Sequence, residues 1–216
     1  MGDVTAPLGR PTRLPMFPLG MVLLPSAGLP LHVFEPRYRA LVHDCLQGDK
    51  EFGVVLIERG SEVGGEDVRT DAGTVAHILE AVELPDGRWA LATVGVRRIR
   101  VERWLPDDPY PVAEVQDWPD PPPSEGFPEA LGECTALLRR TLGLAAEAGD
   151  PAAPATVELA DDPVLASYQA IAVAPIGSFD RQRLLVAETP DERVGALAEL
   201  LSDAIAVLEL RLGGSG

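Results

Sequence analysis

The sequence has few cysteines, few basic residues and no long uninterrupted apolar run, and each shortage excludes a class of protein. Cys45 and Cys134 are the two cysteines among 216 residues. Neither has a C-x-x-C partner or a histidine cluster at ligand spacing, so the sequence predicts neither a disulfide framework nor a zinc site. We therefore expect no cofactor, no metal ion, and a reducing cytoplasm as the compartment.

Basic residues are outnumbered by acidic ones. The chain has 18 Lys and Arg residues against 34 Asp and Glu residues, which gives a formal net charge of −16 at pH 7. Divided after Asp117, the first part carries −6 and the second −10, so neither part is a basic module. A field of this sign repels phosphate backbones and anionic lipid headgroups. The composition therefore argues against nucleic acid and membranes as partners.

One stretch, residues 14–34, has no charged side chain and follows two arginines, in the manner of a signal peptide or membrane span. Prolines interrupt it at positions 15, 18, 25 and 30. Each proline removes a backbone donor and breaks a helix, so a spanning helix here would leave polar groups unpaired in lipid. We therefore expect neither secretion nor a membrane span.

Short apolar runs rich in Val, Ile and Leu, separated by turn residues, continue to about Gln116 and are typical of strands. Pro85-Asp86-Gly87 predicts a tight hairpin. Many glycines and charges in residues 58–73 predict a long mobile loop. The expected strands are residues 16–17, 21–24, 31–34, 52–58, 73–84, 88–96, 99–104 and 111–116.

Helical spacing appears once among the strands and dominates after them. Pro36 to Gln47 has apolar residues on one helical face, with Pro36 suited to the first turn and Gly48 to the stop. After a proline-rich step at 118–124 the pattern becomes helical. The expected helices begin near Phe127, at Asp162-Pro163, at Ser178 and at a capping box, Thr189 to Glu192. We predict a β domain at 1–117 and a helical subdomain at 118–216, with a flexible connection at about 145–161.

A family resemblance rests on the run LPMFPLGMVLLPSAGLPLHVFEPRYRALVHDCL at residues 14–46. This run is similar to the opening of the N-terminal substrate-binding domain of bacterial Lon proteases. FGVVLIERG, GTVAHILEAVELPDG and VGVRRIRV follow in that family's order, and the sequence from Asp161 resembles its helical part. The resemblance implies an α+β fold, in which a PUA-like β-barrel with one inserted helix is followed by a C-terminal helical bundle.

The resemblance also implies a function. We expect a non-catalytic module that recognises unfolded or extended polypeptide segments, with a role as an adaptor in protein quality control that serves a protease or chaperone. Lon ATPases need a G-x-x-x-x-G-K-[ST] loop, and their peptidase needs a serine with a lysine that can lose its proton. Lys50, the one lysine, fits neither motif. We expect structural or surface roles for the three histidines, His32, His43 and His77.

Binding residues are expected where aromatic side chains meet turns. The Phe34-Glu35-Pro36-Arg37-Tyr38 segment is the most recognisable stretch of the family pattern, and Trp89 and Trp118 lie beside a hairpin turn and at the domain step. Large aromatic residues are frequent binding anchors. In the alternative interpretation, Phe34 and Tyr38 pack in the core and Glu35 and Arg37 satisfy a strand-to-helix junction. The candidate binding residues are Phe34, Arg37, Tyr38, Trp89 and Trp118.

Two other functions remain open. An RNA-binding PUA-like protein is suggested by Arg97, Arg98, Arg100 and Arg103, but a strand places Arg98 and Arg100 on one face and Arg97 and Arg103 on the other. We expect these arginines to pair with carboxylates instead. An enzyme of unrecognised type would need a deep pocket that converges on a histidine and a carboxylate. The carboxylate pairs at 107–108 and 161–162 lie beside prolines, where turns and caps explain them.

Overall fold

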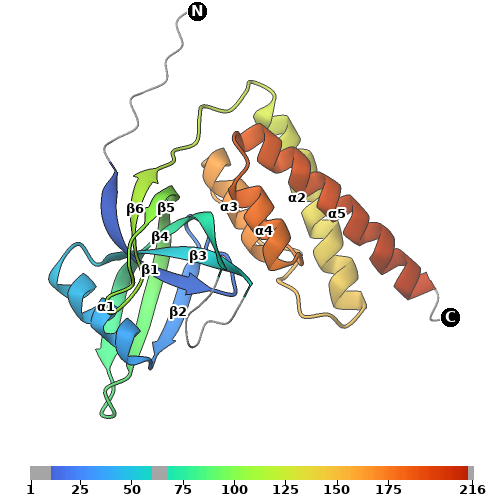
Figure 1. Ribbon diagram of the computed structural model, residues 1–216. Coiled ribbons are helices and arrows are strands. Elements are labelled where there is room, and N and C mark those ends of the chain that lie inside the picture. The colour runs from blue at the N-terminus through green and yellow to red at the C-terminus, as the bar shows by residue number, and fades with distance from the viewer. Residues whose placement is uncertain (1–10, 60–67, 214–216) are drawn as a thin grey trace, which may run out of the picture. The chain divides into compact units, whose positions relative to one another are not determined.

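The computed structural model describes residues 11–59 and 68–213. In this part of the chain the fold is α+β, as predicted, with six strands in one mixed sheet and five helices (Figure 1). The chain divides into two compact units, Met1–Pro119 and Asp120–Gly216. We refer to them as the β unit, which holds all the described strands and α1, and the helical unit, which holds α2 to α5.

The β unit has six described strands, and five of them close into a ring. They are β1 (Thr12–Leu19), β2 (Gly28–Val33), β3 (Glu51–Arg59), β4 (Val68–Glu83), β5 (Trp89–Trp104) and β6 (Val112–Asp117). Their order is β2-β5-β4-β3-β1-β6, and β6 also pairs with β5, which closes the ring. The β1–β3 pair is parallel and the others are antiparallel. The first half of β5 pairs with β2 and its second half with β6.

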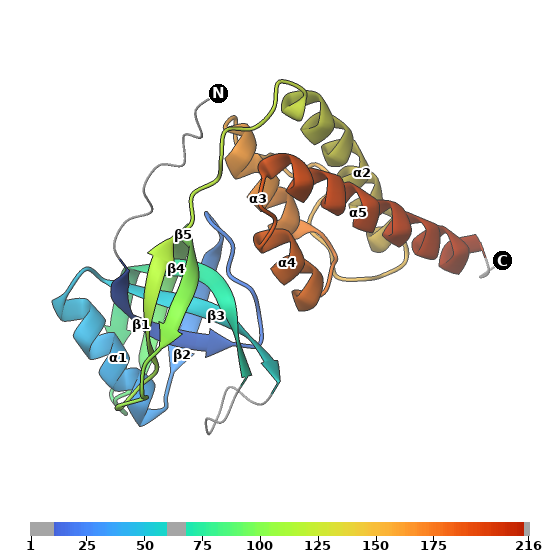
Figure 2. The same ribbon diagram turned by 45° about the horizontal axis from the view of Figure 1, so that its top comes forward.

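The helix α1 (Pro36–Gln47) has the predicted bounds and lies beside the strands in both views (Figures 1 and 2). Tyr38, Leu41, Val42 and Cys45 are buried, as the spacing predicts. Tyr38 stacks on Phe17 of β1 with 4.1 Å between ring centroids, and Phe17 also contacts Phe52 of β3 at 5.9 Å. An aromatic cluster therefore attaches the helix to the sheet.

The predicted strand at residues 21–24 is wrong. This segment has irregular backbone, although Val22, Leu23 and Leu24 are buried. Two of its carbonyls are satisfied without a ladder, because the Thr74 hydroxyl donates to Leu23 at 2.7 Å and the Ala27 amide donates to Leu24 at 3.1 Å. The apolar run thus indicates burial and not pairing.

The two strands predicted at 88–96 and 99–104 are one strand, β5. Its register against β4 shifts between Val75 and Ala76, which pair with Arg97 and Gly95, so Val96 is the extra residue of a bulge. A Cβ at Gly95 would lie 2.2 Å from the Leu24 carbonyl oxygen, so only glycine fits here. The loop predicted at 58–73 is partly wrong too, because β3 continues to Arg59 and β4 begins at Val68; residues 60–67 lie outside the described residues.

The helical unit comprises α2 (Phe127–Glu147), α3 (Pro163–Val173), α4 (Ser178–Leu185) and α5 (Pro190–Gly213). Helices α2 and α5 run side by side (Figure 2). The predicted caps are present: Asp162 accepts from the Leu165 amide at 2.7 Å, and Thr189 from the Glu192 amide at 3.1 Å. The flexible connection predicted from residue 145 begins too early, because α2 continues to Glu147 with Ala145 buried.

An arginine in the core of the helical unit escaped the sequence analysis. The side chain of Arg193 is fully buried and forms an ion pair with Asp120. Its guanidinium lies 4.0 Å from the centroid of the Tyr168 ring and donates to the Ser167 hydroxyl at 3.2 Å. The Tyr168 hydroxyl donates to Asp120 at 2.7 Å. A buried charge needs such partners, so these contacts hold Asp120 in the helical unit.

Candidate functional site

Four of the five predicted binding residues lie near one another in the β unit, where β2 leads into α1. Phe34 directly follows β2, and Arg37 and Tyr38 belong to the first turn of α1. Trp89 is the first residue of β5 and the Cα partner of Val33, the neighbour of Phe34. Trp118 follows β6, and its amide donates to the Arg98 carbonyl at 2.9 Å, on the other half of β5. The fold therefore groups four of these residues and leaves Trp118 apart.

Phe34 and Tyr38 lie in opposite environments. The Phe34 residue is 57% exposed, whereas Tyr38 is 3% exposed. The alternative interpretation, in which both pack in the core, is therefore right for Tyr38 and wrong for Phe34. Trp89 is half-buried against the same core cluster as Tyr38. Phe34 is thus a solvent-exposed aromatic side chain beside buried apolar residues.

A pocket of about 100 Å³ opens beside Phe34. Its lining comes from β1, from the end of β2 with Phe34, and from the start of α1. The volume suits a single apolar side chain. The lining residues are Phe17, Leu19, Leu31, His32, Val33, Phe34, Glu35 and Tyr38.

The pocket lies between two strand edges. In the described part of the chain β2 pairs only with β5, and β6 covers β1 along Thr12–Pro15 and not along the segment that lines the pocket. An open edge is a template for an extended chain. Pro18 of β1 and Pro30 of β2 have no amide N–H to donate, so the edges offer fewer hydrogen bonds than a complete strand would. The two edges therefore offer few backbone hydrogen bonds, and the pocket offers mainly apolar side-chain surface.

Charged groups at the pocket are already paired. The Arg37 guanidinium contacts the Glu35 carboxylate at 3.1 Å and lies 4.5 Å from the centroid of the Tyr38 ring. Both charged side chains are about one-fifth exposed, at 20% and 18%. This ion pair is the arrangement that the alternative interpretation gives to Glu35 and Arg37 at the strand-to-helix junction. The ion pair gives the pocket a polar rim beside its apolar walls.

The arginines of β5 are engaged within the β unit. Arg97 donates to Glu51 at 2.7 and 2.8 Å, and these hydrogen bonds raise the pKa of its guanidinium. Arg103 pairs with Glu114 at 2.9 Å. The predicted carboxylate pairing is confirmed for these two.

Arg98 and Arg100 share a face, as predicted, but they lie over an aromatic ring. Their guanidinium carbons are 4.4 and 3.6 Å from the centroid of Trp118. Arg98 is 2% exposed and Trp118 is half-buried. A stacked and buried arginine offers less to a phosphate backbone than a solvent-facing one.

Nucleophilic and metal chemistry has little support among the described residues. No group of three or more His, Cys, Asp or Glu side chains in this part of the chain is arranged to hold a metal ion. Burial raises the pKa of the Cys45 thiol to about 12 and that of Cys134 to about 11, which disfavours the reactive thiolates. His32 lines the pocket with Glu35, but Glu35 is paired with Arg37. No helix in the described ranges is long and apolar enough to span a membrane.

Sequence reasoning missed the wall of the pocket that β1 provides. The sequence analysis did not predict Phe17 and Leu19 as site residues, and it did not place them in one strand. Apolar residues next to prolines at the end of a strand are ordinarily interpreted as core residues. Phe17 is indeed buried, and it becomes a lining residue only because β6 stops covering β1 at Pro15. The available signal was the proline spacing, which marks unpaired edges.

Comparison with known proteins places this arrangement in a family. A family model described as "ATP-dependent protease La (LON) substrate-binding domain" matches residues 13–203. Lon protease 2 of Herpetosiphon aurantiacus is 30% identical over 92% of this chain, and Lon protease 1 of Myxococcus xanthus is 25% identical over 93%. These matches cover 24% and 26% of the two relatives, so the chain spans about a quarter of their length.

Solved structures show the same fold. The Lon N-terminal domain protein from Xanthomonas campestris is 29% identical and superposes with a TM-score of 0.62, over 88% of this chain and 98% of that one. The N-terminal domain of Mycobacterium avium complex Lon protease has a TM-score of 0.66 at 18% identity, over 89% and 99%. With a family model that matches most of its length, the chain belongs to the LON substrate-binding domain family.

Proposed function

We propose that this chain is a non-catalytic recognition module that binds unfolded or extended polypeptide segments at the pocket beside Phe34. The observation that supports this most directly is an aromatic side chain, 57% exposed, at the mouth of an apolar pocket in a member of this family. Exposed aromatic anchors beside preformed apolar walls are typical of sites that take up apolar side chains.

The expected affinity is modest. Covering the exposed part of a phenylalanine contributes about 2 to 3 kcal/mol at about 25 cal/mol per Å² of apolar surface. The pocket accepts one further apolar side chain, and part of this gain is offset by ordering of the bound segment. Weak contacts of this kind suit a module that samples many unfolded segments.

The wider role follows from the relatives. The two Lon proteases of Herpetosiphon aurantiacus and Myxococcus xanthus are about four times as long as this chain. We infer an adaptor role in cytoplasmic protein quality control, in which the module presents bound segments to a protease or chaperone. The closed ring of strands supports a PUA-like β-barrel, and the side-by-side packing of α2 and α5 supports a helical bundle.

The test is capture of a permanently unfolded, reduced and alkylated model protein by the purified chain. Phe34→Ala should weaken capture by about 1 to 2 kcal/mol, because an anchor is lost from a rigid pocket. Phe179→Ala is the matched control: Phe179 on α4 is 68% exposed and lies outside the pocket lining. Equal capture by the parent and both variants would refute the site, and no capture by the parent would refute the function.

A further inference from the structure

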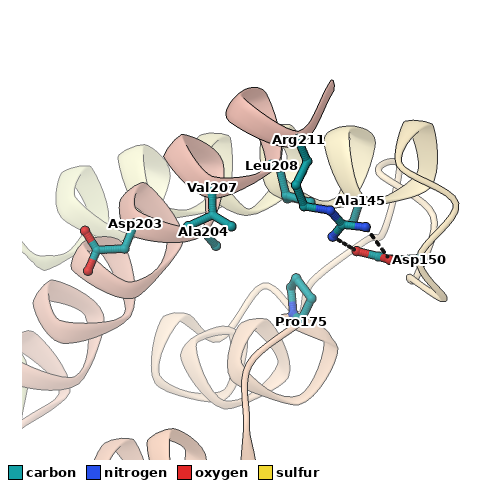
Figure 3. Close-up of a pocket in the computed structure, with 8 residues that line it drawn as sticks. All are labelled: Ala145, Asp150, Pro175, Asp203, Ala204, Val207, Leu208 and Arg211. Carbon is teal, nitrogen blue, oxygen red and sulfur yellow. Dashed lines mark hydrogen bonds and ion pairs between the residues drawn. The ribbon is translucent and has the colours of Figure 1, made fainter. Parts of the chain in front are cut away.

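The helical unit has a larger pocket of its own. It has a volume of about 310 Å³ and lies along the second half of α5, closed by the end of α2 and the segment after α3 (Figure 3). Every lining residue belongs to the helical unit, so the pocket is independent of the site beside Phe34. The lining residues are Ala145, Asp150, Pro175, Asp203, Ala204, Val207, Leu208 and Arg211.

The floor of this pocket is apolar and partly in solvent. Leu208 and Ala145 are buried beneath it, whereas Val207 is 59% exposed. One turn further along α5, Leu210 is 79% exposed. Val207 and Leu210 lie outside the stripe that packs α5 against its neighbours, so their apolar surface has no partner among the described residues. Covering such surface is favourable.

The two ends of the pocket differ in charge. At one end Arg211 donates to Asp150 at 2.8 and 3.3 Å, an ion pair that lowers the pKa of the Asp150 carboxyl (Figure 3). Each of these charges therefore has its counter-charge already. At the other end Asp203 is exposed, and its carboxylate makes no ion pair or hydrogen bond with any residue in the described ranges. The charge that the pocket leaves for a ligand is negative.

The surroundings strengthen this preference. The helical unit has 16 acidic and 6 basic residues, a formal charge of −10. Such a field attracts cationic segments and repels acidic ones before contact. An apolar floor with one carboxylate at its end, in an acidic unit, matches an apolar side chain that is followed by a cation.

We infer that this pocket is a second polypeptide-binding site, which selects extended segments carrying an aliphatic or aromatic side chain next to a lysine or arginine. The apolar side chain lies on Ala204, Val207 and Leu208, and its cationic neighbour pairs with Asp203. The inference rests on the proposed function, because it names a class of segment that the module recognises. It adds a charge preference that the pocket beside Phe34 does not have.

Fluorescence anisotropy with two short labelled peptides tests the inference on the full chain. Both peptides are Gly/Ser-rich, and they differ in one position: one contains Leu-Lys and the other Leu-Glu. The parent should bind the Leu-Lys peptide more tightly. Asp203→Asn should weaken that binding about two- to fivefold, the scale of an exposed ion pair. Val207→Arg, which fills the pocket with a cation, should weaken it about tenfold or more.

Glu199→Gln is the matched control, because Glu199 is an exposed carboxylate one turn before Asp203 on α5 and does not line the pocket. Equal weakening by Glu199→Gln and Asp203→Asn would show that only the general field acts and would overturn the site. A self-associated parent that Val207→Arg makes monomeric in sedimentation would assign the surface to a second copy and overturn the inference. If the parent captures unfolded protein through Phe34 while both pocket variants bind the Leu-Lys peptide like the parent, only this inference fails.

Discussion

Each unit contains a buried arginine that lies over an aromatic ring. The two arginines contact residues on opposite sides of the boundary between the units. In the β unit Arg98 lies over Trp118, the last residue before Pro119, and in the helical unit Arg193 lies over Tyr168 and pairs with Asp120, the first residue after it. In each unit the residue at the boundary therefore contacts a buried arginine of that unit. The difference is that Arg193 has a carboxylate partner at the boundary, whereas Arg98 has an aromatic ring there.

We expect the largest effect from a change at Asp120, the counter-ion of the fully buried Arg193. Asp120→Ala leaves the Arg193 guanidinium buried without its counter-ion, and breaking a buried ion pair costs about 3 to 5 kcal/mol. Urea unfolding followed by circular dichroism should show that loss. Glu209→Gln is the control, since it removes an ion pair with Arg140 whose side chains are 59% and 48% exposed and should cost less than about 1 kcal/mol. A loss at Asp120 no larger than that of the control would contradict the anchoring role.

These features also show what a sequence alone predicts. The bounds of α1 were predictable because Pro36 and Gly48 favour the start and the end of a helix through local backbone effects. The start of α5 was predictable because side chains within a few residues form its cap. The strand predicted at residues 21–24 was wrong because an apolar run indicates burial, whereas strand pairing depends on a neighbouring strand far away in sequence. Here a distant side chain, the Thr74 hydroxyl, satisfies the Leu23 carbonyl instead.

The candidate sites were less predictable than the fold. Phe34, Arg37 and Tyr38 were recognisable because they form one continuous segment. The burial of Arg193 depends on residues far away in sequence, Asp120 and Tyr168, and no local pattern marks it. The exposure of Val207 and Leu210 could have been predicted, because both residues are apolar and lie outside the buried stripe of α5.

In the β unit the corresponding boundary residue is Trp118. Trp118 is the candidate binding residue that lies apart from the other four, and we propose that its half-buried ring still contributes to capture of unfolded segments. Trp118→Ala should weaken capture by about 1 to 2 kcal/mol and leave the chain folded. Capture at parental affinity would remove Trp118 from the site. Unfolding of the variant would instead show that Arg98 and Arg100 use the ring as core.

The smallest expected effect concerns the two thiols, one in each unit. Burial raises the pKa of Cys45 from 9.0 to about 12 and that of Cys134 from 9.0 to about 11, so neither should react with a thiol reagent in the native protein near neutral pH. Because the folded state favours the protonated thiol, the resulting stability is complete below about pH 9 and is lost as the pH rises toward these values. Single-cysteine variants, Cys45→Ser and Cys134→Ser, then report the unfolding of each unit separately in urea. Rapid reaction of either thiol without denaturant would contradict its burial.

Photocrosslinking is the most direct test of whether unfolded segments bind beside Phe34. A photoreactive phenylalanine analogue is placed at position 34 in one variant and at position 179 in another, two exposed positions of the same residue type. With the unfolded model protein present, we expect a much higher crosslinking yield from position 34 than from position 179. Crosslinks of equal yield at the two positions, or none at position 34 while the protein is captured, would contradict it.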